Sequence, residues 1–133
     1  MASSGGLARL EGEERRDPEG ESHPSGRVLD RLDHITRVLG SDAAVASVLD
    51  VSRAQPARWR HGQVPDPENR DRIIGLDAVI ALLSGYLAES TIPKWLNGVN
   101  AHLGNRRPIS VLREGRLSDV IAAIEAQKGG AFA

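Results

Sequence analysis

The chain has 133 residues, of which 40% are apolar and 26% charged, as expected for one globular domain or two very small ones that share a core. It has no cysteine, which excludes disulfide bonds, thiolate zinc sites and thiol catalysis. The net charge of −1 gives no overall basic excess of the kind that nucleic-acid-binding domains usually carry.

The charge is unevenly distributed along the chain. Residues 1–26 hold three basic groups against six acidic ones, whereas residues 27–65 hold six arginines against four aspartates. From residue 66 onward, eight basic groups balance eight acidic ones. The acidity therefore belongs to the front segment, and the basic excess lies in the segment that follows it.

The front segment, residues 1–26, is rich in Gly, Ser, Glu, Arg and Pro, and it has few large apolar residues. Such a composition buries too little apolar surface to offset the entropy lost on ordering, so we expect a disordered tail. No apolar run approaches the roughly 18–20 residues of a membrane span, and the front segment lacks the apolar region of a signal peptide. We therefore expect a cytoplasmic protein with no membrane partner.

Residues 27–65 predict three short helices. Apolar residues at helical spacing predict a first helix from Arg27 to Leu39, with Gly40 as the stop that follows it, and Ser41 or Asp42 is a candidate cap for a second helix at 43–49. A tight turn then leads to a third helix at about 53–60, with Ser52 as its expected N-cap. Two short helices joined by a tight turn are typical of a helix-turn-helix unit.

The remaining residues also predict helices. A long helix at about 68–88 is apolar on more than one face, which indicates burial on several sides or in a subunit interface. Shorter helices follow at 92–97, 99–103, 108–114 and 117–128, and Gly129-Gly130 is expected to end the last one. With no segment of convincing period-two alternation, the predicted fold is all-α. Its predicted segments are a tail (1–26), a helix-turn-helix bundle (27–65), a connecting or dimerisation helix (66–90) and a small C-terminal domain (91–133).

The third helix carries side chains suited to reading DNA. In a helix-turn-helix, residues near the start of the second helix of the pair reach base edges in the major groove. Arginine pairs with guanine and glutamine with adenine, and Arg60, at the end of the helix, is placed for phosphate. We expect Trp59 to lie in the core. The predicted DNA-binding residues are Ser52, Arg53, Gln55, Arg58 and Arg60.

One alternative and one requirement accompany this prediction of DNA binding. The segment is also compatible with a small helical bundle whose solvent face happens to carry arginines. If it does bind DNA, one unit contacts only a few base pairs, so useful affinity requires a dimer on two half-sites. The broadly apolar helix at 68–88 independently favours a homodimer.

Catalytic patterns are missing from the sequence. The four histidines show no metal-ligand spacing, and there is no nucleophile elbow, phosphate-binding glycine loop or dinucleotide fingerprint. We therefore expect no enzyme activity, no catalytic residue, no metal site and no cofactor.

The C-terminal third carries the most specific pattern. It consists of Trp95-Leu96, Asn100, Leu103-Gly104, Pro108, Leu112, Gly115, Val120 and Ile124. Together with Trp59-Arg60-His61-Gly62, this set resembles the Xre–MbcA–ParS family of antitoxins over about residues 28–133. The Trp, the Asn-x-x-Leu-Gly-like step, the Pro and the later Gly that mark the toxin-binding domain of that family correspond here to Trp95, Asn100 with Leu103-Gly104, Pro108 and Gly115.

The resemblance implies a protein of two parts. The front part is implied to repress its own operon by binding operator DNA, and the rear part to neutralise a RES-domain toxin that consumes NAD or transfers its ADP-ribosyl moiety. In that family the C-terminal end of the antitoxin approaches the NAD cleft of the toxin. The toxin-binding residues implied here are Trp95, Asn100, Arg106, Arg107, Arg113, Gly129, Gly130, Ala131, Phe132 and Ala133.

A mechanism follows from the resemblance and the tail residues. A flexible Gly129-Gly130 pair would let Ala131, Phe132 and the terminal carboxylate enter the cleft and exclude NAD. Arg106, Arg107 and Arg113 are candidates for salt bridges with the toxin at the rim of this cleft. The alternative is that they are ordinary solvated surface residues. Two other hypotheses stay open: a stand-alone helix-turn-helix regulator whose rear domain only dimerises, and a neutraliser whose DNA motif is inert.

Overall fold

The computed structural model describes residues 24–131, with side chains from 27 to 130. The chain divides into two compact units, Met1–Asp30 and Arg31–Ala133, and the division falls inside the first described helix. That helix begins at Pro24, so the end of the predicted tail is helical and the expected start at Arg27 is three residues late. Residues 1–23 of the predicted tail lie outside the described residues.

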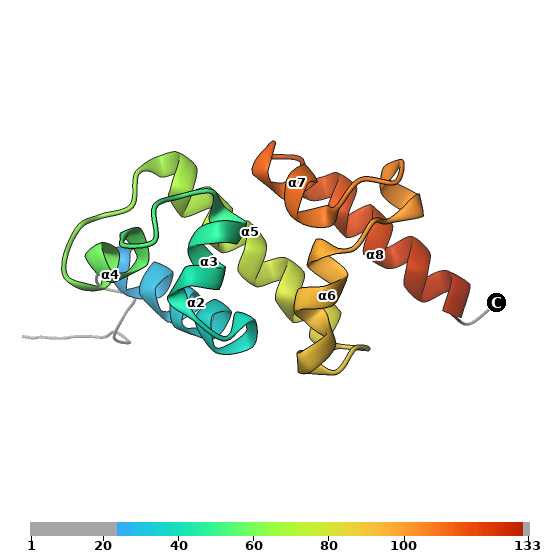
Figure 1. Cartoon of the computed structure of the whole chain (residues 1–133), viewed down its shortest axis with the longest axis horizontal. Helices are drawn as coiled ribbons and strands as arrows, with labels where there is room; N and C mark the ends of the chain where they lie inside the picture. Colours follow the sequence, from blue (N-terminus) through green and yellow to red (C-terminus); the bar gives the residue numbers. More distant parts are fainter. Residues whose placement is uncertain (1–23, 132–133) are drawn as a thin grey trace, which may run out of the picture. The chain divides into compact units, whose positions relative to one another are not determined.

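Within residues 24–131 the fold is all-α, as predicted (Figure 1). No strand forms there, and the one β-type pairing among these residues is an isolated antiparallel bridge between Asn100 and Arg106. In chain order the elements are α2 (Pro24–Leu39), α3 (Asp42–Leu49), α4 (Gln55–Arg60), α5 (Pro67–Ser84), η3 (Glu89–Thr91), α6 (Ile92–Asn97), η4 (Ala101–Leu103), α7 (Pro108–Arg113) and α8 (Leu117–Ala131), where η denotes a 3-10 helix.

Polar caps fix where two of these helices begin. Ser41 is the N-cap of α3, and its Oγ accepts a hydrogen bond from the backbone N–H of Ala44 at 3.1 Å. Asp66 caps α5 in the same way, accepting from the N–H of Asn69 at 2.8 Å. Both caps satisfy backbone donors that the first turn of a helix leaves without an intrahelical partner.

The long helix α5 lies at the centre of the second unit, where it packs against α3, α6, α7 and α8. Asp77 on α5 also accepts hydrogen bonds from Arg31 Nη1 at 3.0 Å and pairs with His34 Nδ1 at 2.6 Å, both on α2. The largest fully buried side chains are Leu32, Ile35, Ile73, Leu76, Ile80, Leu83, Ile92, Leu96, Ile109, Ile124, Val45 and Val79. This aliphatic core accounts within one copy of the chain for most of the apolar character of α5.

Two predicted helix boundaries and one predicted N-cap in the middle of the chain were wrong. The helix predicted at 53–60 starts at Gln55, and Ala54, rather than Ser52, is its N-cap. The reason is a backbone turn in which the carbonyl of Ser52 accepts from the N–H of Gln55 at 3.0 Å. The helix α5 ends at Ser84 instead of residue 88, because the backbone tightens at Gly85 and is extended at Ala88.

Two further corrections concern the C-terminal third. Of the helix predicted at 99–103, a single 3-10 turn, η4, is present. The last helix does not end at Gly129-Gly130 but continues through both glycines to Ala131. Neither glycine adopts the positive φ that ends many helices, so the right-handed backbone is not interrupted there.

Candidate functional site

The turn between α3 and α4 is held by backbone hydrogen bonds. Asp50 has φ +60°, in the left-handed region, and its N–H donates to the carbonyl of Ser47 at 3.3 Å. The N–H of Val51 donates to the carbonyl of Ala46 at 3.0 Å. These bonds close the end of α3 and direct the chain toward α4, which packs against α3 (Figure 1).

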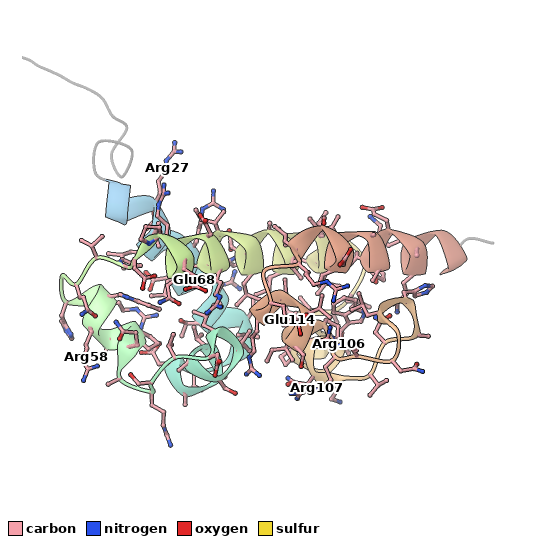
Figure 2. The ribbon with its side chains drawn as sticks, turned by 90° about the horizontal axis from the view of Figure 1, so that it is seen from above. Arg27, Arg58, Glu68, Arg106, Arg107 and Glu114 are labelled. Carbon is pink, nitrogen blue, oxygen red and sulfur yellow. The ribbon has the colours of Figure 1, made fainter. Side chains whose placement is uncertain are left out.

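The short helix α4 has an inner and an outer face. Pro56 and Trp59 point inward, and Trp59 is only 3% exposed, which confirms the prediction of a core residue. Arg53, in the turn before α4, and Arg58 are exposed, and their guanidinium groups make no hydrogen bond or ion pair with any described residue. Figure 2 shows Arg58 projecting away from the helix. The outer face of α4 thus offers two arginines that an anion could contact.

Ser52 and Gln55 belong to the same surface. Ser52 is exposed, whereas Gln55 is half-buried and donates from Nε2 to Oε1 of Gln63 in the loop after α4. Gln55 must exchange this partner before it contacts a base. The structure therefore brings together four of the five predicted DNA-binding residues on or beside the start and outer face of α4.

Arg60, the fifth, has partners within the chain. Its Nη1 lies 2.7 Å from both carboxylate oxygens of Asp42, its Nε donates to Asp33 Oδ1 at 3.1 Å, and its Nη2 donates to Thr36 Oγ1 at 2.7 Å. Burial alone lowers the pKa of Arg60, but the hydrogen bonds and charges of Asp42 and Asp33 outweigh it and raise that pKa. With its nitrogens engaged, this guanidinium is placed to join α4 to α2 and α3 rather than to reach phosphate.

In the C-terminal part, Trp95 joins two helices. This half-buried side chain on α6 donates from Nε1 to Oε1 of Gln127 on α8 at 2.9 Å. The bond holds the short helix α6 against the last turns of α8. Trp95 therefore has a structural partner, with part of its ring left accessible.

Asn100 organises a tight loop. Its Oδ1 accepts from the N–H of His102, and its backbone pairs with Arg106 through an N–H to carbonyl bond of 3.0 Å. The loop returns through Gly104 and Asn105, which both have positive φ. The Asn-x-x-Leu-Gly-like step is thus a loop motif, which explains why a polar residue stands at this helix junction. Next to it, Val99 is 70% exposed, and with Val64 it is one of the two exposed large apolar side chains in the described part of the chain.

Two of the three predicted rim arginines differ in their partners. Arg106 makes a bidentate pair with Glu114, and Figure 2 shows these side chains close to each other. The hydrogen bond from Arg106, assisted by Arg116, lowers the pKa of Glu114 below its ordinary value. Arg107 is exposed, and its guanidinium has no hydrogen-bond or ion-pair partner among the described residues. Arg107 is therefore the more available of the two for a salt bridge.

Arg113, the third, is engaged inside the molecule. Its Nε donates to the carbonyl of Val48 at 3.2 Å and its Nη2 to the carbonyl of Ser47, both in the last turn of α3. The structure thus places Arg113 between α7 and α3 rather than free at a rim.

The remaining predicted residues lie at the end of the chain. Gly129 and Gly130 are exposed on α8, and Ala131 is the last residue of that helix. Phe132 and Ala133 lie outside the described residues. The surface that a tail would extend from is therefore the C-terminal end of α8.

Sequence reasoning missed the partners that hold these residues. Asp33, Asp42 and Thr36 around Arg60, and Gln127 beside Trp95, carry no motif of their own. One sequence signal was usable: Thr36 follows Asp33 by three residues, so both lie on the same side of α2 and can bind one partner. No group of three potential metal ligands occurs in the part of the chain with described side chains. Across the same part, no helix has the length and apolarity needed to cross a bilayer.

Comparison with known proteins identifies relatives, although no protein-family model matches the sequence. The chain is 35% identical over 88 residues to the probable mycobacterial cidal antitoxin Rv3188 of Mycobacterium tuberculosis, covering 66% of this chain and 76% of that protein. It is 34% identical over 89 residues to the mycobacterial cidal antitoxin MbcA of Mycobacterium bovis, covering 66% of this chain and 79% of that protein.

A solved structure agrees with these relatives. The fold matches a chain in the crystal structure of the M. tuberculosis MbcT–MbcA toxin–antitoxin complex with a TM-score of 0.66 and 29% identity. The match covers 80% of this chain and 97% of that chain. The resemblance seen in the sequence is thereby confirmed, and the chain belongs to the MbcA family of mycobacterial cidal antitoxins.

Proposed function

We propose that this chain is an antitoxin that binds and neutralises a cognate RES-domain toxin, with no catalytic role of its own. The observation that carries the proposal is the structural match to a chain of a toxin–antitoxin complex, which covers 80% of this chain and 97% of that chain. A non-enzymatic partner also fits the sequence, which lacks the patterns of the common catalytic sites.

The C-terminal part supplies the proposed toxin surface. Val99 is an exposed apolar side chain beside the Asn100 loop, and Arg107 is an exposed cation on the same connection. An apolar contact flanked by a free charge suits a protein interface, where the apolar group contributes affinity and the charge contributes association rate. Trp95 and Asn100 support this surface through the bonds that fix α6 and the loop.

The proposed inhibition acts at the end of α8. Because α8 is helical through both glycines, we propose that this helix presents Ala131 to the toxin. In this proposal Ala131, Phe132 and the terminal carboxylate enter the NAD cleft. This replaces the flexible glycine hinge of the original hypothesis with a helical arm. A large apolar ring excludes NAD by occupying the space that the nucleotide requires.

NAD turnover by the product of the adjacent gene tests this proposal. The whole chain is compared with a chain truncated after Lys128, and complex formation is measured on the same samples. We expect the truncated chain to bind the toxin but to leave most NAD turnover intact. Equal suppression by both chains would place the inhibition on the surface around Val99 and Asn100 instead.

We further propose that the chain represses its own operon through α4. The exposed arginines Arg53 and Arg58 favour this second function, because their side chains have no hydrogen-bond or ion-pair partner among the described residues. Ser52 and Gln55 complete the proposed contact set, and Arg60 supports it indirectly. Operator binding calls for a homodimer, whose half-sites would lie about one helical turn of DNA apart.

A gel-shift series with promoter DNA from the gene itself tests the second function. The double variant Arg53→Ala and Gln55→Ala should lose sequence-specific binding at moderate salt. Arg70→Ala, an exposed arginine at the start of α5, is the control with one positive charge removed elsewhere. If the double variant and wild type bind equally, α4 does not read the operator, and the chain is a neutraliser with an inert DNA motif.

A further inference from the structure

Arg113 stands where three helices meet. From the end of α7 its guanidinium donates to the carbonyls of Ser47 and Val48 in the last turn of α3. Its own carbonyl accepts from Arg72 Nη2 of α5 at 3.1 Å, and Arg72 is held in turn by Glu68 at 2.9 Å. A single residue thus links the C-terminal part of the chain to α5 and α3.

The end of α3 is a favourable place for this cation. The last carbonyls of a helix lack intrahelical donors and carry the negative end of the helix dipole. Asp50 and Val51 satisfy the carbonyls of Ser47 and Ala46 from inside the turn. Arg113 adds a charged donor from outside, including the bond to Val48. The guanidinium therefore acts on the turn that leads directly into α4.

An open cleft lies beside this joint. A cleft of about 490 Å³ opens between α3, α5, α7 and α8, lined by Val48, Leu49, Leu76, Leu112 and Arg113 among others. Where side chains leave such a space, close packing contributes less to the relative placement of the helices. Directional hydrogen bonds then contribute more, and those of Arg113 span the gap between α7 and α3.

We propose that Arg113 is a positioning residue for operator recognition, which fixes the turn before α4 without touching DNA. The inference rests on the DNA-binding function proposed above, and it differs from the rim role that the sequence resemblance implied for this residue. It gives the C-terminal, toxin-binding part of the molecule a direct mechanical link to the end of α3. Such a link through packed helices is the physical basis on which two sites in one protein can influence each other.

The test compares Arg113→Gln with Arg113→Lys and with Arg116→Gln. Arg116 is an exposed arginine bound to Asp119 and Glu114, so Arg116→Gln removes the same charge from the same region. The probes are a duplex of the gene's own promoter and the toxin from the adjacent gene. Affinity for each is measured at several salt concentrations.

Positioning predicts a split between the two affinities. Arg113→Gln should weaken promoter binding by roughly three- to thirtyfold while toxin affinity stays within about twofold of wild type. The slope of log affinity against log salt should not change, because no phosphate contact is lost. Arg113→Lys should recover part of the affinity, and Arg116→Gln should match wild type in both assays.

Three results would overturn the inference. A salt slope reduced by about 0.9 would show a direct phosphate contact. Lost toxin affinity with intact promoter binding would restore the rim role. Unchanged hydrogen exchange at the Val51 amide in Arg113→Gln would show that the turn does not depend on Arg113. The hydrogen-exchange measurement needs no DNA. It therefore tests whether Arg113 fixes the turn even if the wild-type chain does not bind the promoter and the proposed DNA-binding function is wrong.

Discussion

The carboxylate of Asp42 accepts hydrogen bonds from Nη1 of Arg60 at 2.7 Å to each oxygen, where the first turn of α3 meets the last turn of α4. This pair does two things at once. It places a negative charge at the start of α3, where the helix dipole favours it, and it fixes α4 by its C-terminal turn. A six-residue helix has little stability of its own, so such an attachment decides its orientation.

The Arg60 attachment predicts a loss of stability. Arg60→Gln removes the pairs with Asp42 and Asp33 and leaves two carboxylates close together, so we expect the free energy of unfolding to fall by about 1–2 kcal/mol. Arg58→Gln, an exposed arginine on the same helix, should change it by no more than about 0.5 kcal/mol. Urea unfolding followed by tryptophan fluorescence, to which Trp59 and Trp95 both contribute, measures both. Equal losses for the two variants would contradict the attachment.

Asp50 predicts a second effect on stability. Its φ of +60° costs an ordinary residue about 1 kcal/mol, and Asp and Gly tolerate it better than most. Asp50→Ala should therefore destabilise the chain by about 0.5–1 kcal/mol, whereas Asp50→Gly should be neutral or slightly stabilising. Thermal unfolding of the two variants decides between them. The account fails here if the glycine variant is the less stable one.

The α8 helix predicts that its two C-terminal glycines tolerate alanine. A Cβ at Gly129 or Gly130 meets no atom within 4 Å, and neither residue has positive φ. Replacing both glycines by alanine should raise helicity and stabilise the end of α8 by up to about 1 kcal/mol per site. Circular dichroism measures the first effect. If inhibition of the toxin requires a hinge at these positions, the double variant would instead inhibit poorly, and the helical arm would be wrong.

Much of the helical architecture follows from sequence patterns, for identifiable reasons. Ser41 and Asp66 precede apolar runs and cap helices, and Trp59 is large and apolar enough to be buried wherever α4 packs. The boundaries that failed depend on backbone conformation that composition does not determine. Gly129 and Gly130 are compatible with either a helix or its end, and in the structure both are helical.

The candidate site was predictable as a set of residue types but not as a set of contacts. From the sequence, Arg53, Arg58 and Arg60 were predicted to contact DNA, and the family resemblance implied a toxin-binding role for Arg113. In the structure, Arg60 is bound by Asp42 and Arg113 by the carbonyl of Val48. These partners lie 18 and 65 residues away along the chain, too far for a local sequence pattern to predict them. The folded chain thus separates structural arginines from available ones.

Glu114 predicts a dependence on pH. Its pKa is lowered from the ordinary 4.5, first by the hydrogen bond from Arg106. A carboxylate with a lowered folded pKa stabilises the fold fully above its unfolded pKa, and that contribution is lost as the pH falls through the lowered value. Carboxyl-carbon NMR should show Glu114 titrating below the ordinary value for a glutamate. Arg106→Gln should raise its pKa more than Arg116→Gln does, and the reverse order would contradict the assignment of the main partner.

The central claim is that this chain neutralises the toxin encoded beside it. The most direct measurement titrates the purified chain into that toxin while NAD turnover and complex formation are followed on the same samples. The account predicts that turnover falls in proportion to the complex formed and is fully suppressed at saturation. A toxin that keeps consuming NAD with no complex formed would contradict the account and leave a DNA-binding regulator.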